Sequence, residues 1–275
     1  MKIVAIVTSY NPDIKKLKEN INSYLSWVDH LIIWENTPQE HSCLGELELV
    51  NDKIEILSTG KNEYLAIPFN KCIERAKEYD YDYILTMDQD SHFIGDSFGL
   101  YKDKVASFED ESVTIFAPAT NCLLDKASTI HYIDSGSVYS SGSIYKRKMF
   151  DAIGGFREDL AIYCLDTEIC MRARKYGYKI AMFSDICMEH TEGYKTKGIG
   201  GITVNNYSAQ STYFYVRNNL LLWKIYPADF TFIAKYNFFK YHVIYRIAKI
   251  VFEKNRIAKV KALLLGIVDG VKISV

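Results

Sequence analysis

The chain has 275 residues, enough for one large domain or for one domain with an appendage. Hydrophobic residues make up 48% and charged residues 24%, as is usual for a folded globular protein. The net charge of −1 argues against a protein that coats nucleic acid, and the absence of any run of 18 apolar residues argues against a membrane-spanning helix.

The six cysteines show neither a C-x-x-C pair nor a regular disulfide spacing. Met1 and Lys2 lead directly into a strand pattern, so no signal peptide is predicted. We therefore expect a cytoplasmic protein with reduced cysteines. Tyrosine is frequent, with 21 copies, which suits a carbohydrate or nucleoside surface but equally suits an aromatic core.

The first 90 residues alternate between strand patterns and helix patterns. Short apolar runs bounded by polar residues predict strands, and apolar residues along one face predict helices. The predicted strands are 2–8, 30–34, 54–57 and 84–87. One helix is predicted to begin at about Ile14, with Asp13 as its N-cap, and a second helix is predicted over residues 65–79. This alternation predicts an α/β fold with a mainly parallel sheet, helices on both faces, and polar strand ends at one edge.

Asp88-Gln89-Asp90 follows the fourth predicted strand, at the edge where open α/β sheets place their ligands. Two carboxylates one residue apart suit Mg²⁺ or Mn²⁺, since one can ligate the ion while the other holds a water molecule or a sugar hydroxyl. A solvated turn explains the same residues when they are taken alone. The chain has no glycine-rich dinucleotide fingerprint and no P-loop motif, so a nucleotide would be held by loop side chains and a metal.

The second half continues with strand and helix patterns. Strands are predicted at 113–118, 130–133 and 179–183, and a basic helix start at 146–150. A turn is predicted at 153–158, a helix from Asp166 that Gly177 terminates, and a loop at 189–193.

Nine short segments then occur in a recognisable order. They are Val7–Pro12, Trp34–Asn36, Asn62–Asn70, Met87–Ser91, Ser141–Ser143, Gly154–Phe156, Asp166–Arg172, His190–Gly193 and Tyr213–Asn218. No single segment is specific, but the ordered set resembles the family 2 glycosyltransferases of the GT-A fold, in particular their bacterial rhamnosyltransferase-like branch. The resemblance covers about the first 220 residues.

The resemblance implies an inverting transfer of a sugar from a nucleoside-diphosphate donor. It assigns the nucleoside to Thr8, Tyr10, Asn11, Glu35 and Asn36, and places Asn62 and Asn70 near the base and the sugar. It places Asp88 near the ribose or the metal and makes Asp90 a direct ligand of Mn²⁺ or Mg²⁺, with His190 as a further candidate. A purely structural histidine remains the alternative at His190.

Inversion in a single displacement requires a base for the acceptor hydroxyl and positive charge for the departing diphosphate. Asp166 would be that base, and Glu168 would orient the acceptor or the loop; a helix-capping pair is the alternative for both. Arg217 is a candidate diphosphate partner, with a surface arginine as the alternative.

Two features depart from the family pattern. Relatives often carry an acidic residue before the Asp-x-Glu, where this chain has Ile162-Tyr163-Cys164-Leu165. They also commonly carry a tryptophan after that glutamate, where this chain has Ile169. Both positions concern the acceptor rather than the reaction. The Asp-Gln-Asp-Ser form favours deoxythymidine-diphosphate rhamnose as the donor, with uridine-diphosphate hexoses as the alternative.

Residues 224–275 differ in character from the rest of the chain. They hold ten Lys or Arg against three acidic residues, interleaved with aromatic residues. Basic amphipathic helices bind anionic membrane surfaces, so we expect peripheral attachment at the inner face of the cell membrane. A helical appendage packed on the catalytic domain or on a second subunit is the alternative, while no nucleic-acid motif accompanies the charge.

The sequence therefore predicts a catalytic GT-A domain at 1–223, with a nucleotide-sugar half at about 1–110 and an acceptor half at about 111–223, and a helical tail at 224–275. The predicted product is a cell-surface polysaccharide or a lipid-linked saccharide, and a homo-oligomer remains open. Two alternatives are a nucleotide-sugar or glycan-binding module without catalysis, and a nucleotidyltransferase. The second would normally carry a basic or glycine-rich triphosphate loop, which this chain lacks.

Overall fold

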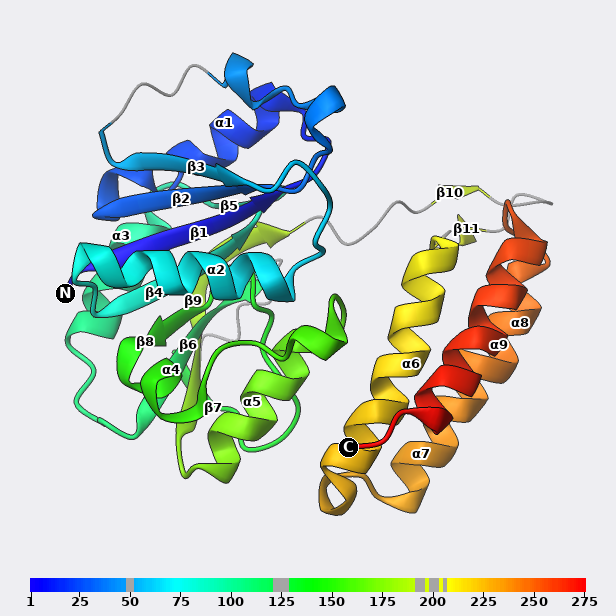
Figure 1. The fold of residues 1–275 in the computed structure, drawn as a ribbon. Helices are drawn as coiled ribbons and strands as arrows, with labels where there is room; N and C mark the ends of the chain where they lie inside the picture. Colours follow the sequence, from blue (N-terminus) through cyan, green and yellow to red (C-terminus); the bar gives the residue numbers. More distant parts are fainter. Residues whose placement is uncertain (48–51, 121–128, 191–195, 198–202, 205–206) are drawn as a thin grey trace. The chain divides into compact units, whose positions relative to one another are not determined.

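The computed structural model describes residues 1–47, 52–120, 129–190, 196–197, 203–204 and 207–275 (Figure 1). The chain divides into two compact units. The first comprises Met1–Ala161 and Leu165–Thr191, and the second comprises Ile162–Cys164 and Glu192–Val275. Each unit is described by itself below.

The N-terminal half of the first unit is a four-stranded parallel sheet. Its strands are β1 (Ile3–Ser9), β2 (His30–Glu35), β3 (Ile54–Ser58) and β4 (Tyr83–Asp88), in the order β3-β2-β1-β4. Helices α1 (Ile14–Asn22) and α2 (Ala66–Ala76) lie on opposite faces of these strands (Figure 1). The side chain of Asp13 caps α1 by accepting a hydrogen bond from the backbone N–H of Lys16, as the sequence predicts.

The sheet continues into a mixed half. Its strands are β5 (Ser91–Phe93), β6 (Val113–Thr120), β7 (Ile130–Tyr132), β8 (Ile144–Lys146) and β9 (Lys179–His190). β8 runs antiparallel between β4 and β6, β9 is parallel to β6, and β5 and β7 both pair antiparallel with β9. Helices α3 (Ser97–Ala106), α4 (Arg147–Ile153) and α5 (Leu165–Lys175) complete the unit. The predicted α/β fold is confirmed, with the parallel arrangement confined mainly to its first half.

One predicted loop is wrong. Glu189 and His190 are the last residues of β9, which runs seven residues beyond the predicted strand. They remain in the strand because β5 pairs with this end of β9, so that Ser91 lies opposite His190. The remaining residues of the predicted loop, 191–193, lie outside the described residues.

The second unit is helical apart from the short strands β10 (Thr196–Lys197) and β11 (Thr203–Val204). Its helices are α6 (Ala209–Ile225), α7 (Phe232–Phe238), a π-helical segment (Phe239–Ile244), α8 (Tyr245–Ile250) and α9 (Arg256–Lys272). The predicted C-terminal helical appendage is thus present. However, α6 belongs to the same unit, so the compact units divide the chain earlier than the predicted boundary at residue 223.

Two glycines let α9 lie close against α6. A Cβ on Gly266 would come within 2.7 Å of the Tyr213 carbonyl oxygen, and one on Gly270 within 2.9 Å of the Leu220 side chain. Any larger residue would push the two helices apart.

The expectation of reduced cysteines is wrong at one position. Cys187, on β9, takes part in a disulfide bond, whereas Cys43, Cys72, Cys164 and Cys170 are free. None of the described helices is long and apolar enough to cross a membrane.

Candidate active site

Asp88, Asp90 and His190 form a cluster at one edge of the sheet. Asp88 is the last residue of β4, Asp90 follows it by two residues, and His190 is the last residue of β9. The Nδ1 atom of His190 lies 3.9 Å from a carboxylate oxygen of Asp88 and 3.8 Å from one of Asp90. Ligand atoms from all three residues lie within 4.8 Å of one another. Residues that are 100 positions apart in sequence thus meet because β5 pairs with the end of β9.

Two serines hold the cluster in place. The hydroxyl of Ser91 lies 2.8 Å from Nδ1 of His190 and accepts a hydrogen bond of 2.9 Å from the hydroxyl of Ser141. Ser141 in turn accepts a hydrogen bond of 3.0 Å from the backbone N–H of Asp88. Both serines are buried. These successive hydrogen bonds fix the imidazole of His190 relative to the backbone that carries the carboxylates.

Among the described residues, His190 is the only basic side chain that lies within 4 Å of the carboxylates of Asp88 and Asp90. Burial raises the pKa of Asp88 to about 6, the negative charges of Asp90 and Asp166 act in the same direction, and His190 opposes them. A half-buried carboxyl group with a shifted pKa and like charges nearby is a frequent mark of a functional site. At neutral pH the cluster therefore carries negative charge that a cation would stabilise.

The residues fit a divalent cation. Carboxylate oxygens suit Mg²⁺ and Mn²⁺, and an imidazole nitrogen completes a donor set without any thiolate. Mg²⁺ binds oxygen at about 2.0–2.1 Å, so two ligands of one ion lie at most about 4 Å apart. The observed separations require only a small side-chain movement to reach that limit. Thr8, which is in register with Asp88, adds a buried hydroxyl with no hydrogen-bond partner in the described part of the chain.

Asp166 lies in the first turn of α5 and is the second acidic feature of the site. One of its carboxylate oxygens accepts a hydrogen bond of 2.8 Å from the backbone N–H of Thr167. Burial raises the pKa of Asp166, which makes the carboxylate a better proton acceptor. Its charge also reaches Asp88, as the pKa of Asp88 shows. The structure thus brings Asp166 and the metal-ligand candidates into one electrostatic environment.

The surroundings of Glu168 differ from those of Asp166. It is buried and pairs with Arg172 at 2.8 Å, one helical turn later. Arg172 also donates hydrogen bonds of 2.6 Å to the carbonyl oxygens of Ile153 and Gly155. Glu168 therefore fixes the turn that follows α4, through Arg172.

Gln89, between the two aspartates, holds the loop after β1. Its side-chain carbonyl accepts a hydrogen bond of 2.7 Å from the backbone N–H of Tyr10, and its amide group donates one of 3.2 Å to the Tyr10 carbonyl. Asn11 adopts a left-handed backbone (φ 44°) and donates its N–H to the Thr37 hydroxyl at 2.8 Å. The side chain of Tyr10 is exposed. Gln89 and Thr37 were not predicted as site residues, because these contacts link residues far apart in sequence.

Glu35 and Asn36 at the end of β2 are both buried. Glu35 accepts a hydrogen bond of 2.6 Å from Ser42. Asn36 accepts hydrogen bonds from the indole N–H of Trp34 and the backbone N–H of Glu63, and donates one to the Tyr64 carbonyl. The side chain of Asn36 therefore already makes three hydrogen bonds inside the protein. Its role in binding a nucleoside stays a prediction.

The two other predicted asparagines also have protein partners. Asn62 accepts a hydrogen bond of 2.8 Å from the backbone N–H of Tyr64. Asn70, on α2, accepts one from the Phe156 N–H at 2.7 Å and donates to the Phe156 carbonyl at 2.8 Å and to Glu158 at 3.0 Å. A Cβ on Gly155 would come within 2.2 Å of Asn70, so the glycine is needed for this contact. Asn70 thus ties α2 to the turn after α4.

Arg217 lies on α6 in the second unit and is not among the residues that the first unit brings together. Its guanidinium lies 5.7 Å from the ring centroid of Phe214 and donates a hydrogen bond of 2.9 Å to Asn218. Its role as a diphosphate partner stays a prediction.

Comparisons with known proteins define the class of fold. The chain aligns with the crystal structure of S. aureus TarS 1-349 in complex with UDP-GlcNAc at a TM-score of 0.58 and 17% identity, covering 96% of this chain and 80% of that one. The alignment with TarS 1-349 alone has a TM-score of 0.56 and 15% identity, covering 99% and 81%. The longer TarS structure is matched over only 44% of its length, at a TM-score of 0.53 and 16% identity. The fold is that of a GT-A glycosyltransferase.

A curated protein is similar to this chain over nearly the whole length of both. The chain is 27% identical to the dTDP-rhamnosyl transferase RfbF of Shigella flexneri, over 98% of this chain and 95% of that protein. No family model matches the chain. The resemblance to the rhamnosyltransferase-like glycosyltransferases, which the ordered motifs indicated, is thus confirmed.

Proposed function

We propose that the protein is an inverting, metal-dependent glycosyltransferase that takes its sugar from a nucleoside diphosphate. The observation that carries this proposal is the cluster of Asp88, Asp90 and His190 at the sheet edge, with Asp166 within electrostatic reach. Metal-ligand candidates and a candidate base in one environment are the two requirements of a single-displacement transfer to an acceptor hydroxyl.

We assign separate roles to the metal-ligand candidates and to the candidate base. Asp90, Asp88 and His190 would hold the ion, and the imidazole favours Mn²⁺ over Mg²⁺ because magnesium prefers an all-oxygen shell. When bound, the ion would stabilise the charge that develops on the departing diphosphate. Asp166 would accept the proton of the attacking hydroxyl, and its raised pKa suits that task at neutral pH.

The donor we propose is deoxythymidine-diphosphate rhamnose. The relative at 27% identity is named as a dTDP-rhamnosyl transferase, and the resemblance extends over nearly the whole of both chains. A uridine-diphosphate hexose is the alternative, since the TarS structure with the same fold holds UDP-GlcNAc. We further propose a growing polysaccharide or a lipid-linked saccharide as the acceptor.

A donor panel tests this function. Thermal shifts would be measured for deoxythymidine-diphosphate rhamnose and for uridine-diphosphate glucose, galactose and N-acetylglucosamine, each with and without Mn²⁺, in the wild type and in Asp90→Ala. We expect a metal-dependent shift with one donor that Asp90→Ala abolishes. The matched control is Asp96→Ala, which removes an exposed carboxylate of the same unit.

Two results would contradict the proposal. One is a shift that is independent of metal and unchanged in Asp90→Ala. The other is the absence of a shift with every donor in folded protein. Binding without any release of nucleoside diphosphate on incubation with acceptor glycans would instead indicate a binding module without catalysis.

The surface of the second unit supports peripheral membrane attachment. Phe232 and Ile257 are 83% and 87% exposed, which is unusual for such apolar side chains. On α9, apolar and basic side chains share one stripe of the helix: Arg256, Ile257, Val260, Lys261, Leu264, Leu265 and Val268. We propose that this stripe lies on an anionic lipid surface, since cations beside apolar groups are complementary to acidic headgroups.

Vesicle flotation tests the attachment. The wild type should float with vesicles of phosphatidylcholine mixed with phosphatidylglycerol, and less with phosphatidylcholine alone. Leu264→Glu should reduce flotation, while Leu100→Glu, at a similarly exposed leucine of the first unit, should not. Equal flotation of both variants would contradict the proposal. Sedimentation that shows a wild-type dimer and a Leu264→Glu monomer would assign the stripe to a second copy of the chain.

A further inference from the structure

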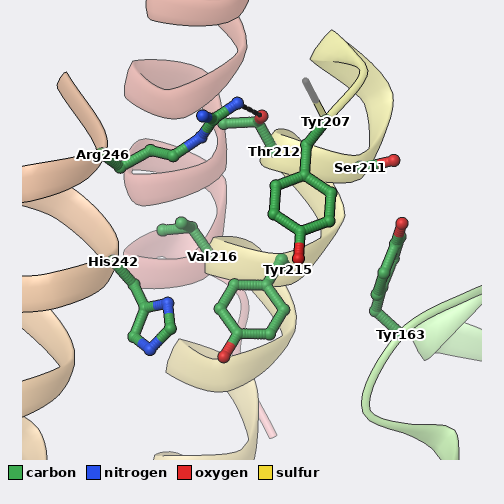
Figure 2. A pocket seen from close by; sticks show the side chains of 8 residues that line it. All are labelled: Tyr163, Tyr207, Ser211, Thr212, Tyr215, Val216, His242 and Arg246. Atoms are coloured by element: carbon green, nitrogen blue, oxygen red, sulfur yellow. Dashed lines mark hydrogen bonds between the residues drawn. The ribbon is translucent and has the colours of Figure 1, made fainter. Parts of the chain in front are cut away.

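The second unit contains a pocket of about 200 Å³ that includes none of the metal-ligand candidates and not the candidate base. Its walls come from Tyr163, from the beginning of α6, from the π-helical segment and from α8 (Figure 2). Every one of these residues belongs to the second unit. The pocket can therefore be described without reference to the sheet.

Four of its eight lining residues carry aromatic rings. The rings of Tyr163 and Tyr215 lie perpendicular to each other, with centroids 6.3 Å apart. The centroid of the His242 ring lies 5.0 Å from that of Tyr215. Tyr207 completes this wall and is 46% exposed (Figure 2). Tyrosine and histidine rings offer an apolar face with a polar edge. A ligand with apolar C–H faces and hydroxyl groups around its rim matches that chemistry.

Polar groups at the rim are held in fixed positions. Arg246 lies over the ring of Tyr207, 5.6 Å from its centroid, and donates a hydrogen bond of 3.2 Å to Thr212. Both ends of its guanidinium also bind the buried carboxylate of Glu253, which accepts a further hydrogen bond of 2.7 Å from Lys259. A few well-placed polar groups in a mainly apolar pocket are typical of small-molecule sites.

Two backbone irregularities meet at this pocket. Tyr163 and Cys164 adopt left-handed conformations with φ of 65° and 63°, which non-glycine residues rarely do. His242 lies in a π-helical segment, and such segments are frequent at functional sites. Strained or irregular backbone that carries pocket residues supports a binding role.

We infer that this pocket binds one saccharide ring of the acceptor. Its volume is close to the roughly 150 Å³ of an apolar cavity that holds a benzene ring, and below the roughly 300 Å³ at which sites for larger ligands begin. A single pyranose ring fits this size, whereas a nucleoside-diphosphate sugar does not. The inference rests on the proposed function, because it names the class of acceptor for the proposed sugar transfer. Tyr163 precedes the candidate base Asp166 by three residues in the chain.

Saturation-transfer NMR on the full chain tests the inference. The probes are the methyl glycosides of rhamnose, glucose, galactose and N-acetylglucosamine. Tyr207→Ala should weaken the binding of the preferred glycoside by about threefold to tenfold, because it removes one ring face and the contact of Arg246. His242→Ala, at an exposed position, should act in the same direction. Tyr236→Ala is the matched control, since Tyr236 is an exposed tyrosine of α7 outside the pocket.

The binding of UDP and dTDP with Mn²⁺ is measured in the same proteins. Glycoside binding that both pocket variants weaken, with nucleotide binding unchanged, is the expected result. Four outcomes would overturn the inference: no glycoside binds, the pocket variants bind glycosides like the control, the pocket variants lose nucleotide binding instead, or nucleotide displaces the glycoside. If nucleotides fail to bind while the glycoside depends on Tyr207, the proposed function fails but the saccharide site stands.

Discussion

The two units of this protein differ in how their acidic side chains and their large apolar side chains are surrounded. In the first unit a large cluster of apolar side chains forms a buried core, while burial and the charges of Asp90 and Asp166 raise the pKa of Asp88 at the sheet edge. In the second unit the buried carboxylate of Glu253 lies between two cations, while large apolar side chains are exposed. The comparison indicates that the first unit acts through charge and the second through apolar and aromatic surface.

The largest effect is expected from the candidate base. Asp166→Asn keeps the shape of the side chain but removes its ability to accept a proton, so the release of nucleoside diphosphate should fall about 10²-fold to 10⁴-fold. Donor affinity, measured by calorimetry, should change little. The control is Asp151→Asn, at an exposed carboxylate of the same unit. A variant with normal turnover would remove Asp166 from the mechanism.

The second prediction concerns the charge balance of the helical unit. Glu253→Gln removes the carboxylate charge that binds both Arg246 and Lys259, whose side chains are only 12% and 4% exposed. The free energy of unfolding should fall by about 3 kcal/mol in a denaturant titration. Glu74→Gln, which breaks an exposed pair with Lys77, should cost less than about 0.5 kcal/mol. Equal effects would mean that Glu253 is not neutralising buried charge.

The third prediction concerns the pH dependence at the sheet edge. Metal binding requires ionised Asp88, whose pKa burial raises from 3.8 to about 6. Mn²⁺ affinity should therefore fall by up to about tenfold per pH unit below pH 6. Without metal, the folded state holds this proton more tightly than the unfolded state between pH 3.8 and 6, so this group's contribution to stability falls as pH rises through that range. A Mn²⁺ affinity that stays constant from pH 7 to pH 5 would contradict this assignment.

The smallest effect separates scaffold from donor contact in the first unit. Asn70→Ala removes three hydrogen bonds to the turn after α4 and should lower the free energy of unfolding by about 1–3 kcal/mol. Donor affinity in the folded variant should stay near that of the wild type. A tenfold loss of donor affinity with unchanged stability would instead support the predicted contact of Asn70 with the base or the sugar.

The parallel half of the sheet could be predicted from the sequence because its signals are local. Each strand is a continuous apolar run that ends in polar residues, and Asp13 caps the following helix as short-range geometry requires. The same local reasoning placed Asp88 and Asp90 at the carboxyl end of a strand, where β4 ends with Asp88. These predictions depend on neighbouring residues only.

The parts that were missed depend on pairing between distant residues. The extension of β9 to His190 follows from its pairing with β5, and the contacts of Gln89 and Asn36 reach backbone groups 27 to 79 residues away. The pocket around Tyr207 likewise forms only when separate segments meet. A single sequence does not show which distant residues pair with each other.

The most direct test of the central claim is Mn²⁺ paramagnetic resonance on the wild type, His190→Gln and Asp90→Ala. If Asp88, Asp90 and His190 hold the ion, the wild type should bind Mn²⁺ with a ¹⁴N coupling from an imidazole. His190→Gln should lose that coupling, and Asp90→Ala should bind Mn²⁺ much more weakly. Bound Mn²⁺ whose spectrum and affinity are the same in all three proteins would contradict a metal site at this edge of the sheet.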